Sequence, residues 1–345
     1  MSKPKTAGRL ICEKECAKNK GVKDFTLATE IYKAHKDLFR SQEQVRGYIK
    51  TIRGHSGKGK RSQATQIKPI TYDNSHSAKP IKKIESGAKI LLLDIETAPL
   101  KGYIWGLWKQ NIGINQITND WFILTWAAKW LFEEKVYSMR LTSKEAIQQK
   151  DKRIMEGLWE MLNEADVVIG HNSSQFDIPK INTRFLINGM IPPLPYQQID
   201  TLKVVKKSFA FSSNKQEFLN MSLGSPRKVD TGGFDLWDAC YKGDEQALKK
   251  MEEYNMGDIT SLELNYLKLR PFITGHPNIG LFILDGLQRC PSCGSDNLKD
   301  CGKNYYTSVG VYELRKCDDC GANSRIRKSK TTPKEKNGIL SPSAR

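Results

Sequence analysis

The sequence contains no long apolar run. No stretch reaches about 18 consecutive apolar residues, the shortest that crosses a membrane as a helix, so we expect neither a membrane span nor a membrane partner. The first residues are polar and lack the apolar segment of a signal peptide, so we expect a cytoplasmic protein. In that compartment the eight cysteines are expected to be thiols or metal ligands instead of disulfides.

Acidic residues are scarce relative to basic ones, and the imbalance is concentrated near the N-terminus. The chain has 55 Lys+Arg and 38 Asp+Glu, a net charge of +17. Residues 1–89 hold 21 of the basic residues and only 8 of the acidic ones. Such a concentration favours a polyanionic partner over a merely solvated surface, and nucleic acid is the partner we expect.

Composition and periodicity divide the chain into five regions. Apolar strand-like runs alternate with amphipathic helical patterns in the longest region, which predicts an α/β domain. The predicted regions are a helical basic domain (1–56), a flexible basic linker (57–88), the α/β domain (89–286), a module with two cysteine pairs (287–327) and a disordered basic tail (328–345).

Two carboxylates follow the most apolar segment, in "KILLLDIETAPL" (89–100). Ile90–Leu93 predicts a buried strand, and residues two apart in a strand share a face, so Asp94 and Glu96 should project together. Neighbouring carboxylates raise each other's pKa unless a cation lies between them. The alternative is a strand end in water, with both groups hydrated.

Two later segments supply further acids. Asp177 falls at the start of a predicted helix that follows the apolar strand Val167–Gly170. In "KKMEEYNMGDITSLELNYLKL" an amphipathic helix places Tyr254 and Asp258 four residues apart on its apolar stripe. An acid on an apolar stripe needs a partner or a metal. These acids therefore favour a metal site over a hydrated strand end.

The acidic motifs resemble those of a known nuclease family. The three exonuclease motifs of the DEDD family, in its tyrosine-bearing branch, are matched by Asp94-x-Glu96, Asp177 and Tyr254-x-x-x-Asp258. The resemblance covers about 89–275, where "GHNSSQFDIPKI" looks like the second motif, and "QIDTLKV" and "SNKQEFLNMSLG" are similar to segments of family B polymerase proofreading domains. It implies a ribonuclease H-like fold, a mixed β-sheet flanked by helices. The chain is also similar to nucleases of tailed phages and prophages, which implies a bacterial host cytoplasm and phage replication or recombination proteins as partners.

The resemblance implies a 3′–5′ exonuclease that uses two Mg²⁺ or Mn²⁺ ions. Such ions prefer carboxylate oxygens, and a pair of them stabilises the attacking and leaving oxygens of a phosphodiester. Asp94 would bridge the ions, Glu96 and Asp258 would complete one site, and Asp177 would hold the second ion, partly through water. Tyr254 would orient the attacking water.

Residues of the second motif are expected to contact the substrate. Asn172 and Phe176 stand in their usual places in that motif, which implies a contact of Asn172 with the 3′-terminal nucleotide. The other interpretation of Asn172 is a turn residue after a strand. We interpret the neighbouring His171 as a packed or substrate-proximal histidine, and Asp200 as a helix cap or turn residue.

Two C-x-x-C-G motifs predict a C-terminal zinc ribbon with one structural zinc site. Thiolates bind Zn²⁺ tetrahedrally in closed structural sites, and a module of about 40 residues needs such a staple to fold. A redox-active pair is the alternative. Cys301 is surplus and is expected to be an unligated thiol. The predicted zinc ligands are Cys290, Cys293, Cys317 and Cys320.

The N-terminal region carries a predicted helix pair, "FTLATEIYKAHKDLF" and "SQEQVRGYIKTIRG". Ser41 and Gln44 form a capping-box pattern at the start of the second helix. The pair resembles a helix-turn-helix module, in which the second helix reads DNA. A solvated basic helix is the alternative, and Cys12 and Cys16 are taken as free thiols. That helix has a predicted buried stripe, Val45, Ile49 and Ile52, and a predicted DNA-contacting face, Arg46, Lys50 and Arg53.

The sequence therefore favours a metal-dependent 3′–5′ exonuclease that acts on DNA more than RNA. A structure-specific nuclease or an exoribonuclease on the same fold remains an alternative. A DNA-binding regulator with an inactive nuclease domain is another, although the presence of all five motif residues argues against it.

Overall fold

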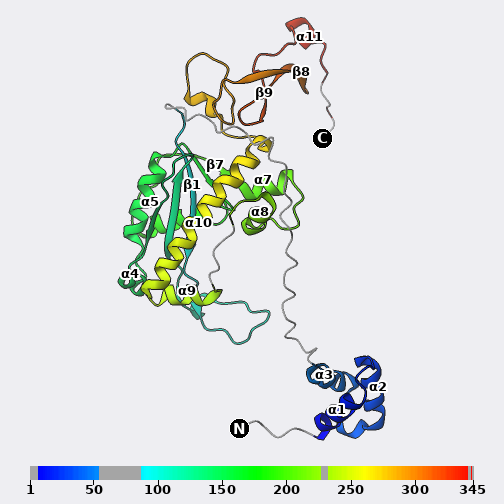
Figure 1. Ribbon diagram of the computed structural model, residues 1–345. Coiled ribbons are helices and arrows are strands. Elements are labelled where there is room, and N and C mark those ends of the chain that lie inside the picture. Colours follow the sequence, from blue (N-terminus) through cyan, green and yellow to red (C-terminus); the bar gives the residue numbers. More distant parts are fainter. Residues whose placement is uncertain (1–6, 54–86, 227–231, 341–342, 344–345) are drawn as a thin grey trace. The chain divides into compact units, whose positions relative to one another are not determined.

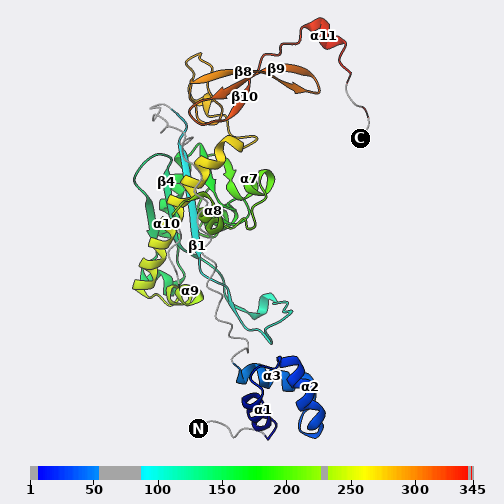
Figure 2. The same ribbon diagram turned by 45° about the vertical axis from the view of Figure 1, so that its right-hand side comes forward.

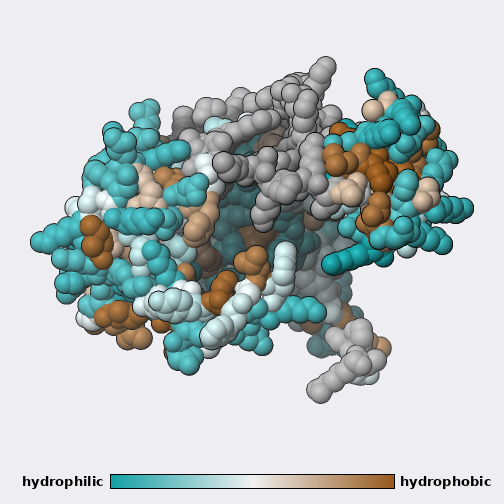
Figure 3. All heavy atoms as spheres, turned by 90° about the horizontal axis from the view of Figure 1, so that it is seen from below, coloured by the Kyte–Doolittle hydropathy of each residue, from teal (hydrophilic) through white to brown (hydrophobic). Residues whose placement is uncertain are grey.

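The chain forms two compact units, Met1–Ile70 and Thr71–Arg345. Figure 1 shows helices alone in the first unit, and a sheet, flanking helices and a strand-rich C-terminal part in the second. In Figure 3, hydrophilic side chains cover most of the coloured surface and hydrophobic ones form smaller groups. Almost all of the expected linker (57–88) lies outside the residues that this computed structural model describes. These are 7–53, 87–226, 232–340 and 343. Within them, no helix is long and apolar enough to cross a membrane.

Three helices form the described part of the N-terminal unit. They are α1 (Ala7–Lys18), α2 (Asp24–Ala34) and α3 (Gln42–Ile52), with the 3₁₀ turn η1 (Lys36–Leu38) before α3. The sequence pattern predicts only the last two helices. The buried stripe of α1 consists of Gly8, Cys12 and Cys16, which are too small to give a clear apolar period. Burial in this core raises the pKa of Cys12 to about 11, so its thiol stays protonated.

The start of α3 shows half of the expected capping box. The Ser41 hydroxyl accepts a hydrogen bond from the backbone N–H of Gln44 at 3.3 Å. The Gln44 side chain accepts from the N–H of Arg40 at 2.7 Å and not from that of Ser41. The predicted stripe is present, because Val45 and Ile49 are buried and the next apolar residue, Ile52, is half-buried.

Five strands form the central sheet of the second unit, in the order β5-β4-β1-β6-β7. β1 is antiparallel to β4 and parallel to β6, so the sheet is mixed. The pairing of β1 with β4 runs to Thr97, whereas its described pairing with β6 ends at Leu92. One edge of the end of β1 is therefore open. The strands are β1 (Ile90–Thr97), β4 (Ile123–Trp130), β5 (Tyr137–Arg140), β6 (Val167–Gly170) and β7 (Gln197–Asp200).

The two faces of the sheet bury different helices. Odd-numbered residues of β1, such as Leu91 and Leu93, pack with α5 (Lys152–Glu164) and α6 (Asp177–Ile187). Even-numbered residues of β1 face α10 (Glu245–Leu269), which lies across the other side of the sheet in Figure 1. This alternation follows from the two-residue period of a strand. Each fully buried leucine contributes about 1.5–3 kcal/mol relative to an exposed one.

A buried ion pair joins α10 to the sheet. Lys129 of β4 lies opposite Leu92 of β1, so it faces α10, where it pairs with Glu263. Glu263 also accepts a hydrogen bond from the backbone N–H of Phe132 at 2.8 Å. Both charged side chains are almost fully buried. The contact fixes α10 over the sheet at a point five residues beyond Asp258.

Shorter elements complete this part. α7 and α8 share a small core with the end of α10, through Val205, Leu219 and Leu269. β2 and β3 pair with each other as a separate hairpin. The bounds are α4 (Ser143–Gln148), α7 (Thr201–Ser208), α8 (Gln216–Leu223), α9 (Phe234–Tyr241), η4 (Arg270–Phe272), η5 (Ile279–Phe282), β2 (Lys101–Gly102), η3 (Ile114–Gln116) and β3 (Ile117–Asn119).

The C-terminal part contains a three-stranded sheet, β8 (Leu298–Thr307), β9 (Gly310–Cys317) and β10 (Asn323–Arg325), in the order β10-β9-β8. The tail beyond it differs from the expected disordered segment. The N–H of Lys330 donates to the Val311 carbonyl at 2.8 Å, and a short helix, α11 (Pro333–Asn337), begins with a capping box of Thr332 and Glu335. Backbone pairing with β9 and this cap therefore order part of the tail.

Candidate active site

Asp94 and Glu96 lie on the face of β1 that carries α10. They continue the even-numbered series that begins with Ile90 and Leu92 in the core under α10. The face thus changes from apolar to acidic as the strand leaves the core, and both carboxylates are half-buried. The shared face that the sequence predicts for this pair is present.

α10 brings a third carboxylate to the same place. Asp258 precedes Ile259, which packs in the core beneath α10, and only 2% of its surface is exposed. Carboxylate oxygens of Asp94, Glu96 and Asp258 all lie within 4.8 Å of one another. Three like charges so close together are unfavourable without protons or a cation between them. Their hard oxygen donors fit Mg²⁺ or Mn²⁺.

Asp177 adjoins this cluster without being part of it. It is the first residue of α6, and its Oδ1 accepts a hydrogen bond at 3.1 Å from the N–H of Ile95, the residue between the two β1 acids. Burial raises the pKa of Asp177 to about 7, against the opposing effect of the Ile95 hydrogen bond. The negative charge of Asp200 also raises it. The structure therefore brings three of the four predicted acids together and places the fourth beside them.

Two further side chains of α10 border the cluster. Tyr254, one turn before Asp258, is half-buried, and its ring meets Trp237 edge-on with centroids 6.4 Å apart. Asn255 is fully buried, and its Nδ2 donates to the Oδ2 of Asp94 at 3.4 Å. The Oδ1 of Asn255 has no hydrogen-bond partner among the described residues. Asn255 is not among the site residues predicted from the sequence, although an amide three residues before Asp258 on an apolar stripe was the available signal.

The turn after β6 is fixed by Asp200. Oδ1 of this residue accepts from the N–H of Asn172 at 2.9 Å and from the N–H of Leu202 at 3.0 Å, which confirms its predicted role as a helix cap. Asn172 has φ +67°, a left-handed conformation that asparagine tolerates. His171 contacts the Thr201 hydroxyl and the Asn214 carbonyl, each at 2.9 Å, and is therefore a packed histidine.

Two aromatic rings and a lysine lie beside Asp177. Phe176, immediately before it, is partly exposed. Lys180, one turn after Phe176 on α6, places its Nζ 3.7 Å from the ring centroid of Trp121 and 5.1 Å from that of Phe176. Burial lowers the pKa of Lys180, while Asp120 and Asp177 oppose the shift. A cation held between aromatic faces next to an acidic site is suited to a phosphate or a base.

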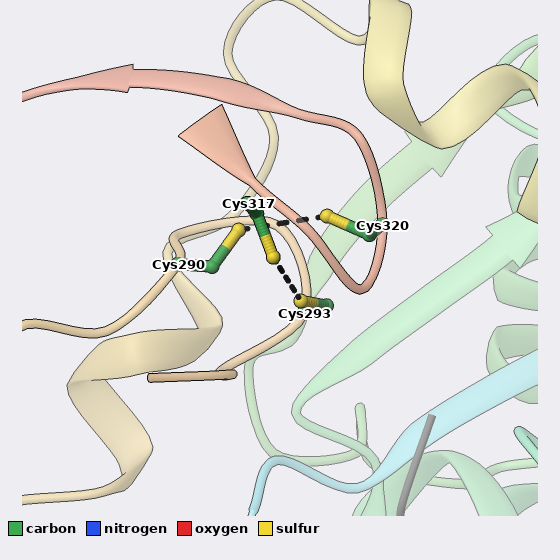
Figure 4. Close-up of side chains that lie close together, drawn as sticks. All are labelled: Cys290, Cys293, Cys317 and Cys320. Atoms are coloured by element: carbon green, nitrogen blue, oxygen red, sulfur yellow. Dashed lines mark hydrogen bonds between the residues drawn. The ribbon is translucent and has the colours of Figure 1, made fainter. Parts of the chain in front are cut away.

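The four predicted zinc ligands converge in the C-terminal part. Figure 4 shows their sulfurs pointing toward one another from two loops. Sγ–Sγ distances are 3.6 Å for Cys290–Cys320 and for Cys293–Cys317, and all four sulfurs lie within 4.8 Å of one another. Four thiolates bound tetrahedrally at about 2.3 Å from Zn²⁺ would stand about 3.8 Å apart, so the cluster fits this ion. Cys301 lies on β8 and outside the cluster.

Contacts among the thiols shift their titration. Hydrogen bonds within the cluster lower the pKa of Cys290 and Cys317 and raise the pKa of Cys293 and Cys320. Two hydrogen bonds connect α10 with the loop that carries Cys290. The hydroxyl of Tyr266, on α10, lies 2.8 Å from Nε2 of His276 in the segment that follows the helix. Farther along that segment, the N–H of Ile279 donates to the carbonyl of Pro291, the neighbour of Cys290, at 2.8 Å.

The basic face predicted for α3 is divided in its contacts. Arg53 donates to the carbonyls of Asn19 and Val22, each at 2.5 Å, and to Asp24 at 2.9 Å, so its guanidinium holds the helices together. Arg46 and Lys50 are half-exposed. The predicted contact of Arg53 with nucleic acid is replaced by this internal role.

Comparison with known proteins finds a superfamily profile that matches part of the second unit. A profile of the RNase H superfamily matches residues 123–269, which run from the first residue of β4 to the last of α10. No curated protein sequence matches the chain.

Among solved structures, the chain is similar to the family B DNA polymerase from the hyperthermophilic archaeon Pyrobaculum calidifontis. The TM-score is 0.41, with 16% identity over 53% of this chain and 25% of that one. This chain therefore spans about a quarter of the length of the polymerase. The mixed sheet, its flanking helices and the matched segment together show that the second unit contains a domain with the ribonuclease H-like fold.

Proposed function

We propose that this protein is a metal-dependent 3′–5′ exonuclease of the tyrosine-bearing DEDD type that acts on DNA. The approach of Asp94, Glu96 and Asp258 to within 4.8 Å carries the proposal, because bound cations would stabilise three carboxylates that lie so close together. The match to the RNase H superfamily supports a nuclease in general. The finer assignment rests on Tyr254, one turn before Asp258 on the same helix.

The four acids would hold the two ions. Asp94 would contribute to the binding of both ions, as its resemblance to the first residue of the DEDD motifs implies. Glu96 and Asp258 would complete one site, and Asp177 would serve the other from the start of α6. Ions bound there would stabilise charge on the attacking and leaving oxygens of the phosphodiester.

Two residues of α10 would position the reacting groups. The hydrogen bond from Asn255 restrains the Asp94 carboxylate, so we assign Asn255 as a positioning residue. Tyr254 would hydrogen-bond the attacking water through its hydroxyl, while packing on Trp237 fixes the direction of its ring. The water then attacks the phosphorus, and the 3′-oxygen of the penultimate nucleotide leaves.

Regions outside the sheet would hold the nucleic acid. Asn172, Phe176 and Lys180 border Asp177 and would contact the terminal nucleotide. The N-terminal unit would dock duplex DNA through Arg46 and Lys50 of α3. Zn²⁺ bound to the four thiols would staple the C-terminal part, which carries further basic side chains. If the chain is phage-encoded, proteins of phage replication or recombination are the partners we propose.

The test is a degradation assay with DNA and RNA, single-stranded and duplex, labelled at either end, with Mg²⁺ or Mn²⁺. A 5′-labelled strand should shorten progressively, and a 3′-labelled strand should release its label first as a mononucleotide. Circular single-stranded DNA should stay intact. Cleavage of the circle would instead indicate a structure-specific endonuclease, and preference for RNA would indicate an exoribonuclease.

A matched pair of variants identifies the catalytic site. Asp94→Asn removes one charge from the acidic cluster and should abolish degradation. Glu160→Gln removes one charge from an exposed position of α5, on the opposite side of the sheet, and should leave degradation unchanged. Equal activity of the two variants would contradict the assignment.

A further inference from the structure

The connection between β1 and β4 forms a projecting arm, residues 101–119. Its base is the hairpin of β2 and β3, and the N–H of Tyr103 donates to the carbonyl of Gln116 at 2.9 Å. The Gln116 side chain joins the two sides, donating to the Tyr103 carbonyl at 3.0 Å and accepting from the N–H of Gly113 at 2.8 Å. Figure 2 shows the arm extending beyond the end of β1, away from the sheet. The arm is thus an ordered hairpin with its own hydrogen bonds.

The arm exposes large apolar side chains that a folded protein usually buries. Trp105 is 95% exposed and Trp108 is 84% exposed. Tyr103, near the base, is also exposed, as are four aliphatic residues, Ile104, Leu107, Ile112 and Ile114. A concentration of this kind marks a binding surface. Two indole rings three residues apart are suited to stacking on planar groups.

The charge of the arm fits a polyanion. Residues 97–119 contain no acidic residue, and Lys109 is basic. Lys101, at the base, is already engaged: its Nζ lies 3.4 Å from the ring centroid of Tyr241 and 3.8 Å from a carboxylate oxygen of Asp238. Exposed aromatic rings, amides and a lysine, in a segment without acidic residues, match a single nucleic-acid strand better than a protein surface or a second copy of this chain.

The arm is continuous with the acidic site. It leaves the sheet directly after β1, which carries Asp94 and Glu96, and returns through Trp121. The N–H of Ala98 donates to the carbonyl of Phe122 at 2.8 Å, so the two ends of the arm are joined next to the acids. The ammonium group of Lys180 lies over the ring of Trp121 and also over the ring of Phe176, the neighbour of Asp177. A row of aromatic and cationic groups therefore runs from Asp177 to the base of the arm.

We propose that the arm is a stacking platform for single-stranded nucleic acid whose 3′ end occupies the acidic site. The inference rests on the proposed nuclease function and adds the path of the strand to it. Bases upstream of the terminal nucleotide stack on Trp105 and Trp108, while Lys109 lies near the phosphates. Because every base has a planar face, the platform accepts any sequence.

The test measures binding of a fluorescein-labelled oligothymidylate, long enough to span the site and the arm, by anisotropy in buffer without added divalent metal. The full chain with both substitutions, Trp105→Ala and Trp108→Ala, is compared with wild type and is called the alanine variant. Each of the two removed rings should contribute a loss of affinity of about 5- to 150-fold, the range for base stacking on an aromatic residue. The slope of log affinity against log salt should not change, because every phosphate keeps its basic partners.

Two control variants separate stacking from general loss of apolar surface. Trp105→Phe with Trp108→Phe keeps two rings and should retain most of the affinity. Leu284→Ala removes an equally exposed apolar side chain far along the sequence and should bind as wild type. Circular dichroism and thermal melting establish that each variant is folded.

Several outcomes would overturn the inference. One is wild-type affinity in the alanine variant, and another is an equal loss of affinity in the alanine and phenylalanine variants. The third is that the wild-type protein sediments as a dimer, while the alanine variant sediments as a monomer and keeps its affinity for the oligonucleotide. That third outcome would mean that the arm binds a second copy of this chain. Because binding is measured without divalent metal, it is independent of cleavage. Hydrolysis that survives Asp94→Asn would count against the proposed function alone.

Discussion

The buried ion pair between Lys129 and Glu263 leads to a quantitative prediction about how α10 is held. Lys129→Met leaves the Glu263 carboxylate buried, with only the Phe132 N–H as a described partner. Glu263→Gln keeps an acceptor for that N–H but leaves the Lys129 charge unpaired. Breaking a buried pair in this way costs about 3–5 kcal/mol of unfolding free energy, because one charge stays in a low-dielectric site. A domain near 200 residues loses roughly 2–4 °C of melting temperature per kcal/mol, so each single variant should melt roughly 6–20 °C lower.

The double variant should behave differently. Lys129→Met with Glu263→Gln contains no buried charge at this position and should lie within about 1.5 kcal/mol of wild type, because replacing both members of such a pair is often nearly neutral. Urea unfolding of the four proteins, followed by circular dichroism in buffer with zinc, gives the coupling energy as a double-mutant cycle. A coupling below about 1 kcal/mol would refute this explanation and mean that apolar packing and the contacts of Arg140 with Glu245 and Glu252 hold α10 on the sheet.

Four further predictions concern metal, catalysis, pH and docking. Asp258→Ala should abolish degradation while leaving circular dichroism unchanged. Excess EDTA should abolish degradation by the wild-type protein, and activity that survives in EDTA would exclude the two-metal site. Tyr254→Phe should lower kcat about ten- to a thousandfold, the effect of removing one hydrogen bond that positions the water, and wild-type turnover would assign the ring to packing only. The pKa of Asp177 is raised to about 7 in the fold, so between about pH 4 and pH 7 the metal-free folded state holds a proton that the unfolded chain has released. Its unfolding free energy should therefore fall as pH rises through that range, by up to about 1.4 kcal/mol per pH unit, and Asp177→Asn should remove this slope in urea titrations with EDTA. Deletion of 1–88 should reduce the log–log salt slope for duplex binding by about 0.9 for each phosphate that the deleted segment neutralises, and equal slopes would show that the N-terminal charge is only a solvated surface.

The parts of the fold that follow local rules can be predicted from the sequence. The apolar run Ile90–Leu93 gives β1, and the three- and four-residue spacing of apolar side chains gives α10. Since strands place alternate residues on one face, the pairing of Asp94 with Glu96 also follows. Sequence spacing cannot give the distance from these acids to Asp258, because it depends on how α10 crosses the sheet.

Residues governed by distant contacts could not be predicted. Arg53 continues the basic stripe of α3 in the sequence. In the fold, however, its guanidinium donates hydrogen bonds to Asp24 and to the carbonyls of Asn19 and Val22 in the segment between α1 and α2. Asn255 looks like an ordinary polar residue of a helix, and only tertiary packing buries it against Asp94. Helix α1 has small residues at its buried positions, so its amphipathic signal is weak.

The way the arm joins the sheet bears on how such a protein diversifies. The Ala98–Phe122 hydrogen bond and the Thr97–Ile123 pairing join the two ends of the arm at the sheet. The length of the arm therefore does not determine the position of Asp94 or Glu96. Insertions into an already closed surface loop cost little, because closure entropy grows only slowly with loop length. Recombination or design can thus exchange arms of different length or composition without a change in the sheet that carries Asp94 and Glu96.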